Sequence, residues 1–118
     1  MSETEVQPIS PCAAFQLVEI RVGRVMRVEL NSRAKKPAYK LWIDFGSEFG
    51  AKTSSAQLVA NYSAEDLKNR LVVCATNLGT RNIAGFISEV LTMGASDENG
   101  NVVLLQTAKD VPLGSRVY

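Results

Sequence analysis

Tyr39-Lys40-Leu41-Trp42-Ile43-Asp44-Phe45-Gly46 is the clearest predicted strand of the chain, because aliphatic and aromatic residues alternate over residues 39–45 with charged residues at every second position except Trp42. An alternation with a period of two is typical of a β-strand that buries one of its faces. The predicted buried face carries Leu41, Ile43 and Phe45, and the opposite face carries Lys40, Trp42 and Asp44. The only tryptophan therefore shares a face with two charges, where it either stacks on a ligand or covers the sheet or a subunit interface.

The segment before this strand also alternates. Apolar and charged residues alternate over residues 18–22, and the alternation resumes beyond Gly23 with its phase changed. A glycine together with a change of phase inside one long strand predicts a β-bulge or a sharp bend. Small barrels need such a bend in order to close.

The rest of the chain adds further strands and one short helix. Ser63-Ala64-Glu65-Asp66 resembles a capping box, which predicts a helix that ends near Lys68. Leu71–Ala75 is apolar on both faces and predicts a central strand. More strands are predicted at residues 51–60, 84–92 and 102–105, with turns at residues 46–50 and 97–100. This order of elements predicts an all-β barrel.

One domain preceded by a short arm is the predicted organisation. Residues 1–14 contain Pro8 and Pro11 and show no usable period, so we expect an N-terminal arm there and a folded domain over residues 15–118. The longest apolar run is far shorter than the ~20 residues of a membrane-spanning helix, and the N-terminus lacks the apolar core of a secretory signal. Cys12 and Cys74 are expected to be free, buried thiols of a cytoplasmic protein.

Charge and residue types indicate a binding module and argue against an enzyme. The net charge is only +1, but residues 15–55 hold eight basic and four acidic side chains, so one face can still be basic. The chain has no histidine to act as a catalytic base, no set of residues with metal-ligand spacing and no glycine-rich phosphate loop. We therefore predict no catalysis, no metal and no cofactor.

A polar loop between two apolar runs is the clearest candidate for a binding site. Asn77-Leu78-Gly79-Thr80-Arg81 offers amide and guanidinium donors, and Ser88-Glu89 follow within the next predicted strand. Such donors suit a phosphate, a carboxylate or a peptide backbone.

Several separate motifs resemble the tRNA-binding domain family, in the right order and over nearly the whole chain. Val18-Glu19-Ile20-Arg21-Val22-Gly23-Arg24-Val25 is similar to its opening strand, and Tyr62–Leu67 to its short helix. Asn77-Leu78 through Arg81, with Gly85 and Ser88-Glu89, is similar to its N-L-x-x-R-x-x-x-G-x-x-S-E segment.

Three stretches resemble the CsaA subfamily of export-related chaperones more than the generic tRNA-binding module. They are Lys36–Gly46, Ser54-Ser55-Ala56-Gln57 and Ser88-Glu89-Val90-Leu91; residues 102–106 also look like this subfamily. The resemblance implies a five-stranded OB-fold barrel with a short helix between strands 3 and 4 and with terminal extensions that form a homodimer. It also implies a chaperone for unfolded or presecretory polypeptides, with tRNA or RNA binding by the same face as the alternative.

Each hypothesis has its own candidate residues. For a polypeptide, the expected walls are Trp42, Phe86 and Val90, and the expected hydrogen-bonding groups are Ser54, Ser55, Gln57, Asn77 and Arg81. For RNA, the expected face is formed by Lys40, Lys52, Asn77, Arg81 and Ser88. The apolar residues Phe86 and Val90 equally fit a plain core position. We rank the polypeptide first, because the subfamily-like stretches outweigh the generic ones.

Overall fold

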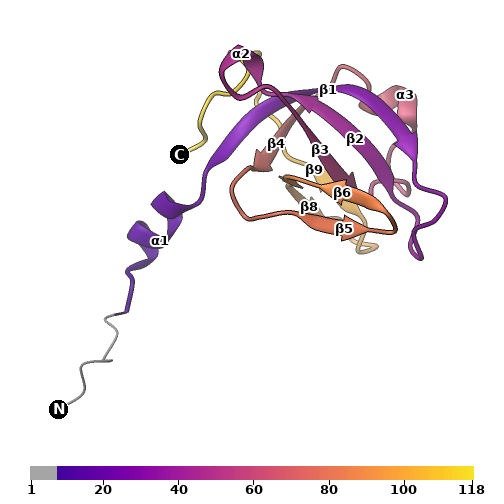
Figure 1. Ribbon diagram of the computed structural model, residues 1–118, viewed down its shortest axis with the longest axis horizontal. Coiled ribbons are helices and arrows are strands. Elements are labelled where there is room, and N and C mark those ends of the chain that lie inside the picture. The colour runs from indigo at the N-terminus through magenta and orange to yellow at the C-terminus, as the bar shows by residue number, and fades with distance from the viewer. Residues whose placement is uncertain (1–7) are drawn as a thin grey trace.

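An antiparallel five-stranded sheet, curled into a nearly closed barrel, forms the body of the protein (Figure 1). The structure is a computed structural model and describes residues 8–118. The strand order is β3-β2-β1-β4-β7. The strands are β1 (Ile20–Leu30), β2 (Tyr39–Asp44), β3 (Ala51–Ala56), β4 (Leu71–Ala75) and β7 (Leu91–Thr92). Helix α3 (Ala64–Leu67) joins β3 to β4, so the predicted OB-fold architecture is confirmed.

The core lies where the alternation of β2 predicts it. Leu41 and Ile43 are fully buried, and Lys40, Trp42 and Asp44 lie on the outer face of the sheet. All five residues of β4 are buried, which confirms the predicted central strand. Ser63 begins α3 through the predicted capping box, because its hydroxyl accepts from the Asp66 amide while the Asp66 carboxylate accepts from the Ser63 amide.

Strand β1 bends as predicted, but at a different residue. Its pairing with β2 shifts between Val25 and Arg27, so the bulge is at Met26. Gly23 instead pairs regularly with β4. A Cβ atom on Gly23 would lie 2.5 Å from Ile43 Cγ2 and within 3 Å of the Phe45 ring. The glycine therefore makes room for the core, and the irregularity of the strand lies at Met26.

The single strand predicted at residues 84–92 is wrong. The chain forms a hairpin there, with β5 (Arg81–Ile83) and β6 (Phe86–Ser88), before it enters β7. Its two turn residues, Ala84 and Gly85, both have positive φ, at 50° and 88°. This is the backbone of a type I′ turn, which reverses the chain within two residues. Figure 1 shows the hairpin next to β3, outside the five-stranded sheet.

The remaining elements are short. The turn predicted at residues 46–50 is a single helical turn, α2 (Gly46–Phe49). The turn predicted at residues 97–100 joins β8 (Gly94–Ser96) to β9 (Val102–Leu104), which form a second hairpin. No helix within residues 8–118 is long and apolar enough to cross a membrane.

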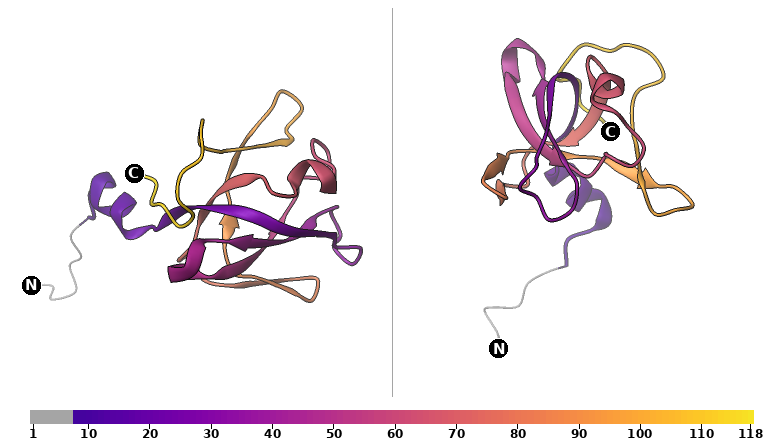
Figure 2. Two further views of the ribbon diagram at one scale, coloured as in Figure 1. Left: turned by 90° about the horizontal axis from the view of Figure 1, so that it is seen from above. Right: turned by 90° about the vertical axis from the view of Figure 1, so that its right-hand side faces the viewer.

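Helix α1 (Pro11–Leu17) projects from one end of the barrel (Figure 2). Ser10 caps it by accepting from the Ala13 amide, and no residue of α1 is buried. The helix spans the boundary predicted between the arm, residues 1–14, and the domain that follows it. Residues 1–7 of the arm lie outside the described part of the chain. Cys12 is exposed in α1, so the expectation of two buried thiols is wrong for this residue; Cys74 is buried in β4.

Candidate functional site

A groove of about 1090 Å³ runs between two segments that are distant in the sequence. One wall is the β1–β2 loop, residues 31–38, and the other is the segment that leads from β4 into the β5–β6 hairpin. Ser55 and Gln57, at the end of β3, lie between these walls. Ligands of OB-folds bind on the β2–β3 side of the barrel, between the loops that follow strands 1 and 4. The groove is therefore in the position where this fold places its ligand.

The groove is basic. Four of its lining residues carry a positive charge, namely Arg33, Lys35, Lys36 and Arg81, and none of the described lining residues is acidic. Within residues 8–118 none of these four cations forms an ion pair. Their charge is thus not neutralised inside the described molecule and can attract an anion.

Apolar side chains lie among these cations. Leu78 and Leu91 line the groove and are 56% and 54% exposed, and Ile83 is half-buried beside them. Large apolar side chains so exposed offer a surface for an uncharged part of a ligand, such as a base or an apolar side chain.

Two sets of contacts seat the hairpin on the outer face of the sheet. Phe86 packs edge to face against Trp42, with ring centroids 5.5 Å apart. On the other side, Glu89 Oε1 accepts from the Thr53 amide at 3.0 Å, and the Glu89 amide donates to the Thr53 carbonyl at 2.8 Å. The Ser88 hydroxyl accepts from the Ser55 amide at 2.9 Å. The hairpin, and with it Arg81, is therefore held against β3.

The structure brings some of the predicted site residues into the groove. The residues that line it are Ser55, Gln57, Arg81, Ser88 and Val90. Val90 is only 5% exposed, and the Ser88 hydroxyl already accepts a hydrogen bond from the Ser55 amide of β3. Both residues therefore belong to the floor of the groove. Arg81 and Gln57 are exposed.

Other predicted residues lie elsewhere. Trp42, Phe86 and Lys40 form a group on the outer face, in which the Lys40 amine lies 5.6 Å from the Phe86 ring centre. Lys52 pairs with Ile43, so its side chain leaves the opposite face of the sheet from Lys40.

Two more of the predicted residues have structural partners. Ser54 has no exposed surface, and its hydroxyl lies 2.8 Å from that of Thr92. Asn77 uses both ends of its amide, because Oδ1 accepts from the Glu19 amide and Nδ2 donates to the Leu17 carbonyl, each at 2.8 Å. Asn77 thus fixes the connection between α1 and β1.

Sequence reasoning did not place Lys35, Lys36 and Leu78 in the site. The signal for the two lysines was the excess of basic residues at 15–55, but charge counting does not show which of them face a common ligand. Only the fold brings the β1–β2 loop opposite residues 78–84.

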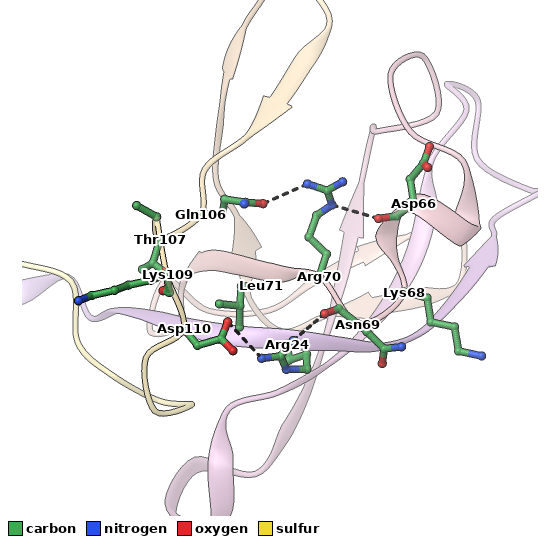
Figure 3. A pocket seen from close by; sticks show the side chains of 11 residues that line it. Arg24, Asp66, Lys68, Asn69, Arg70, Leu71, Gln106, Thr107, Lys109 and Asp110 are labelled. Atoms are coloured by element: carbon green, nitrogen blue, oxygen red, sulfur yellow. Dashed lines mark hydrogen bonds and ion pairs between the residues drawn. The ribbon is translucent and has the colours of Figure 1, made fainter.

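A second, smaller cleft of about 370 Å³ lies between residues 66–71 and the loop 106–110 (Figure 3). Its guanidinium groups already have partners: Arg24 donates to the Asn69 carbonyl at 2.7 Å, and Arg70 to the Asp66 carbonyl and to Gln106.

The cleft also carries the carboxylates of Asp66 and Asp110. Hydrogen bonds from Ser63 hold the pKa of Asp66 below its usual range, so this carboxylate stays charged. Mixed charges make the second cleft the poorer site for a polyanion.

Comparison with known proteins agrees with this fold. The model of the putative tRNA-binding domain matches residues 20–116. The chain is 35% identical to methionine–tRNA ligase of Methanocaldococcus jannaschii over 103 residues, which are 87% of this chain but only 15% of that enzyme.

Two solved structures match this chain over the full length of their own chains. The chaperone CsaA of Bacillus anthracis is 39% identical, with a TM-score of 0.86 over 94% of this chain and 100% of that one. The CsaA chaperone of Picrophilus torridus is also 39% identical, with a TM-score of 0.85 over 93% and 100% of the two chains. The chain therefore belongs to the putative tRNA-binding domain family, as a CsaA-like member.

Proposed function

We propose that this protein is a non-catalytic, cytoplasmic RNA-binding module, and that the groove between residues 31–38 and 78–84 binds a tRNA. The observation that carries the proposal is the set of four cations in the groove, with no acidic residue among its described lining. Contacts between basic side chains and phosphates supply most of the affinity of proteins for nucleic acid. The match to the putative tRNA-binding domain supports the same ligand.

The order of the two hypotheses changes because of where the residues lie. Both sets of expected residues lose members: Ser54 of the polypeptide set is fully buried, and Lys40 and Lys52 of the RNA set do not line the groove. Asn77, expected in both sets, is bound to backbone atoms on both sides. Lys35 and Lys36 add charge that an apolar polypeptide does not need, whereas RNA does.

A second candidate ligand is an unfolded or presecretory polypeptide in the same groove. The exposed Leu78 and Leu91 favour it, because a nucleic acid backbone gains little from bare aliphatic side chains. The likeness to two CsaA chaperones also supports it. An extended chain of either kind fits an OB-fold face.

Salt dependence separates the two ligands. If four cations each meet a phosphate of an unpaired strand, the logarithm of the association constant falls with the logarithm of salt concentration by a slope of roughly 3. Binding of an unfolded, uncharged polypeptide changes little over the same range. Fluorescence anisotropy with labelled tRNA and with a labelled unfolded polypeptide, from 50 to 300 mM salt, measures both. Weak tRNA binding together with salt-independent polypeptide binding would replace the first proposal by the second.

We further propose that the protein is a homodimer that uses α1. Phe15 and Leu17 are 48% and 67% exposed on a helix that buries none of its residues. The helix is nevertheless fixed to the barrel, because the Arg116 guanidinium donates to the Gln16 carbonyl at 2.9 Å and Asn77 donates to the Leu17 carbonyl. A helix that is held in place and exposes two large apolar side chains is suited to contact with a second copy of the same chain.

A further inference from the structure

Asn31 is a buried polar residue beneath the groove. It is only 2% exposed and lies just after β1, at the start of the β1–β2 loop. Its side-chain oxygen accepts from the Arg33 amide at 3.1 Å, and its side-chain nitrogen donates to the Ile83 carbonyl at 3.2 Å. One amide group therefore ties the loop that carries three of the groove cations to the hairpin strand that begins with Arg81.

A second contact joins the same two walls above Asn31. A Cβ atom on Gly85 would lie 3.0 Å from Arg33 Nη1, so the guanidinium rests against the hairpin turn. The turn is itself held by Asn82, whose side-chain oxygen accepts from the Gly85 amide at 2.8 Å. The two walls are thus joined both below the surface, through Asn31, and at the tip of the hairpin, through Arg33.

We propose that Asn31 is a positioning residue that fixes the width of the groove, and that this fixed width restricts the ligand to an unpaired RNA strand. The inference rests on the proposed RNA binding. A cavity of about 1090 Å³ holds a few unstacked nucleotides of a single strand. Double-stranded RNA is bound differently, across successive minor grooves, by a surface much longer than this groove. These contacts between the walls oppose the opening that a duplex would need.

Asn31→Asp is the sharpest substitution, because it keeps the size and the oxygen that accepts from Arg33. It replaces the donor to Ile83 by a second oxygen, which repels that carbonyl. Asn61→Asp is the control outside the groove: the Asn61 side-chain nitrogen donates to the Val102 carbonyl and to the Asp97 carboxylate of the β8–β9 hairpin. The control makes the same chemical change and loses these donated bonds, while the groove is unchanged.

The readouts are the affinities of the full chain for one RNA sequence, supplied once as a single strand and once as a duplex. For Asn31→Asp we expect about a tenfold loss of single-strand affinity and a smaller ratio of single-strand to duplex affinity. Asn61→Asp is expected to keep both values. Wild-type affinity in Asn31→Asp, or an equal loss in Asn61→Asp, would overturn the proposal.

A double-mutant cycle separates positioning from general loosening. In a background that lacks Arg33 and Arg81, through Arg33→Ala and Arg81→Ala, the added Asn31→Asp should cost less affinity than in the wild type, because two of the four cations that it positions are gone. The same loss in both backgrounds would contradict positioning. If Asn31→Asp does not fold, Gly85→Asn tests the upper contact: asparagine tolerates the positive φ of this turn but displaces the Arg33 guanidinium.

Hydrogen exchange keeps the test independent of the proposed function. Asn31→Asp should speed the exchange of the backbone amides at 81–88, where Asn61→Asp should not. Unchanged exchange there would overturn the positioning role. If the wild type binds no RNA while these amides respond as expected, the proposed function and its ligand class fail, and the positioning of the hairpin by Asn31 stands.

Discussion

Trp42 and Phe86 meet edge to face, with their ring centroids 5.5 Å apart and their planes inclined by 68°. One ring belongs to the outer face of the barrel sheet and the other to the separate β5–β6 hairpin. The Arg27 guanidinium lies 4.6 Å from the centre of the Trp42 ring on the same outer face. The only tryptophan of the chain therefore supports the hairpin that carries Arg81, and does not itself line the groove.

This contact predicts a measurable coupling between the two rings. Aromatic pairs of this geometry contribute about 0.5–1.5 kcal/mol beyond the area that they bury. Trp42→Leu and Phe86→Leu should each lower the free energy of unfolding, and the double variant should lose less than the sum, by about that amount. Denaturant unfolding measures all four proteins. Strictly additive losses would show that the rings do not hold the hairpin.

The turn of the hairpin predicts a stabilising substitution. Ala84 has a φ of 50°, a conformation that costs an L-residue with a Cβ atom about 1–2 kcal/mol and that asparagine tolerates better. Ala84→Asn should therefore raise the free energy of unfolding by up to about 1 kcal/mol. Ala84→Val, with a β-branched side chain at the same φ, should lower it. A thermal or denaturant unfolding series decides between this ranking and its reverse.

Cys74 predicts a loss of stability in alkaline solution. Burial raises the pKa of its thiol from 9.0 to about 12, so the folded protein holds this proton more tightly than the unfolded chain does. Above pH 9 the unfolded chain releases this proton while the folded protein still holds it, which favours the unfolded state. The stability that the buried, neutral thiol contributes at lower pH is therefore lost progressively from about pH 9 to about pH 12. A Cys74→Val variant has no thiol at this position, so its free energy of unfolding lacks this dependence on pH.

The test is the difference in free energy of unfolding between wild type and Cys74→Val from pH 8 to pH 11. As the pH rises, the free energy of unfolding of the wild type should fall relative to that of the variant. A difference that stays constant with pH would contradict the raised pKa of Cys74. Thiol labelling offers an independent check on the same chain. One equivalent, from the exposed Cys12, should react quickly in the native protein, and a second only after unfolding.

The proposed dimer predicts that Leu17→Ser lowers the molecular mass in solution. Leu17 is 67% exposed on α1, and a polar residue there weakens an apolar contact with a second chain. Leu105→Ser is the control, since Leu105 is also exposed but follows β9 on the far hairpin. Sedimentation of the two variants and of the wild type compares their masses. A wild-type mass equal to that of a single chain would refute the proposal.

Local sequence patterns predicted most of the barrel. The alternation in residues 39–45, the apolar run of β4 and the capping box at Ser63 each involve neighbours in the sequence, so their structural meaning could be inferred directly. The hairpin escaped prediction because its turn places Ala84 at positive φ, where asparagine or glycine is usual.

The groove depends on contacts between distant residues, and here sequence patterns fail. The sequence predicts that Ser54 is available to a ligand, but Ser54 pairs with Leu41 and therefore lies on the buried face of β3. Lys35 looked like one of many solvated lysines until the fold set its loop opposite Arg81. Neither fact follows from periodicity, because both depend on which strands pair and in which register.

The most direct test of RNA binding in the groove compares two charge reversals that change the net charge equally. Arg81→Glu places the reversal in the groove, and Lys109→Glu places it in the second cleft, on a side chain that is also exposed. Anisotropy with labelled tRNA should show at least a tenfold loss for Arg81→Glu, with a shallower salt slope, and less than a twofold change for Lys109→Glu. Equal losses in the two variants, or none in Arg81→Glu, would contradict the account.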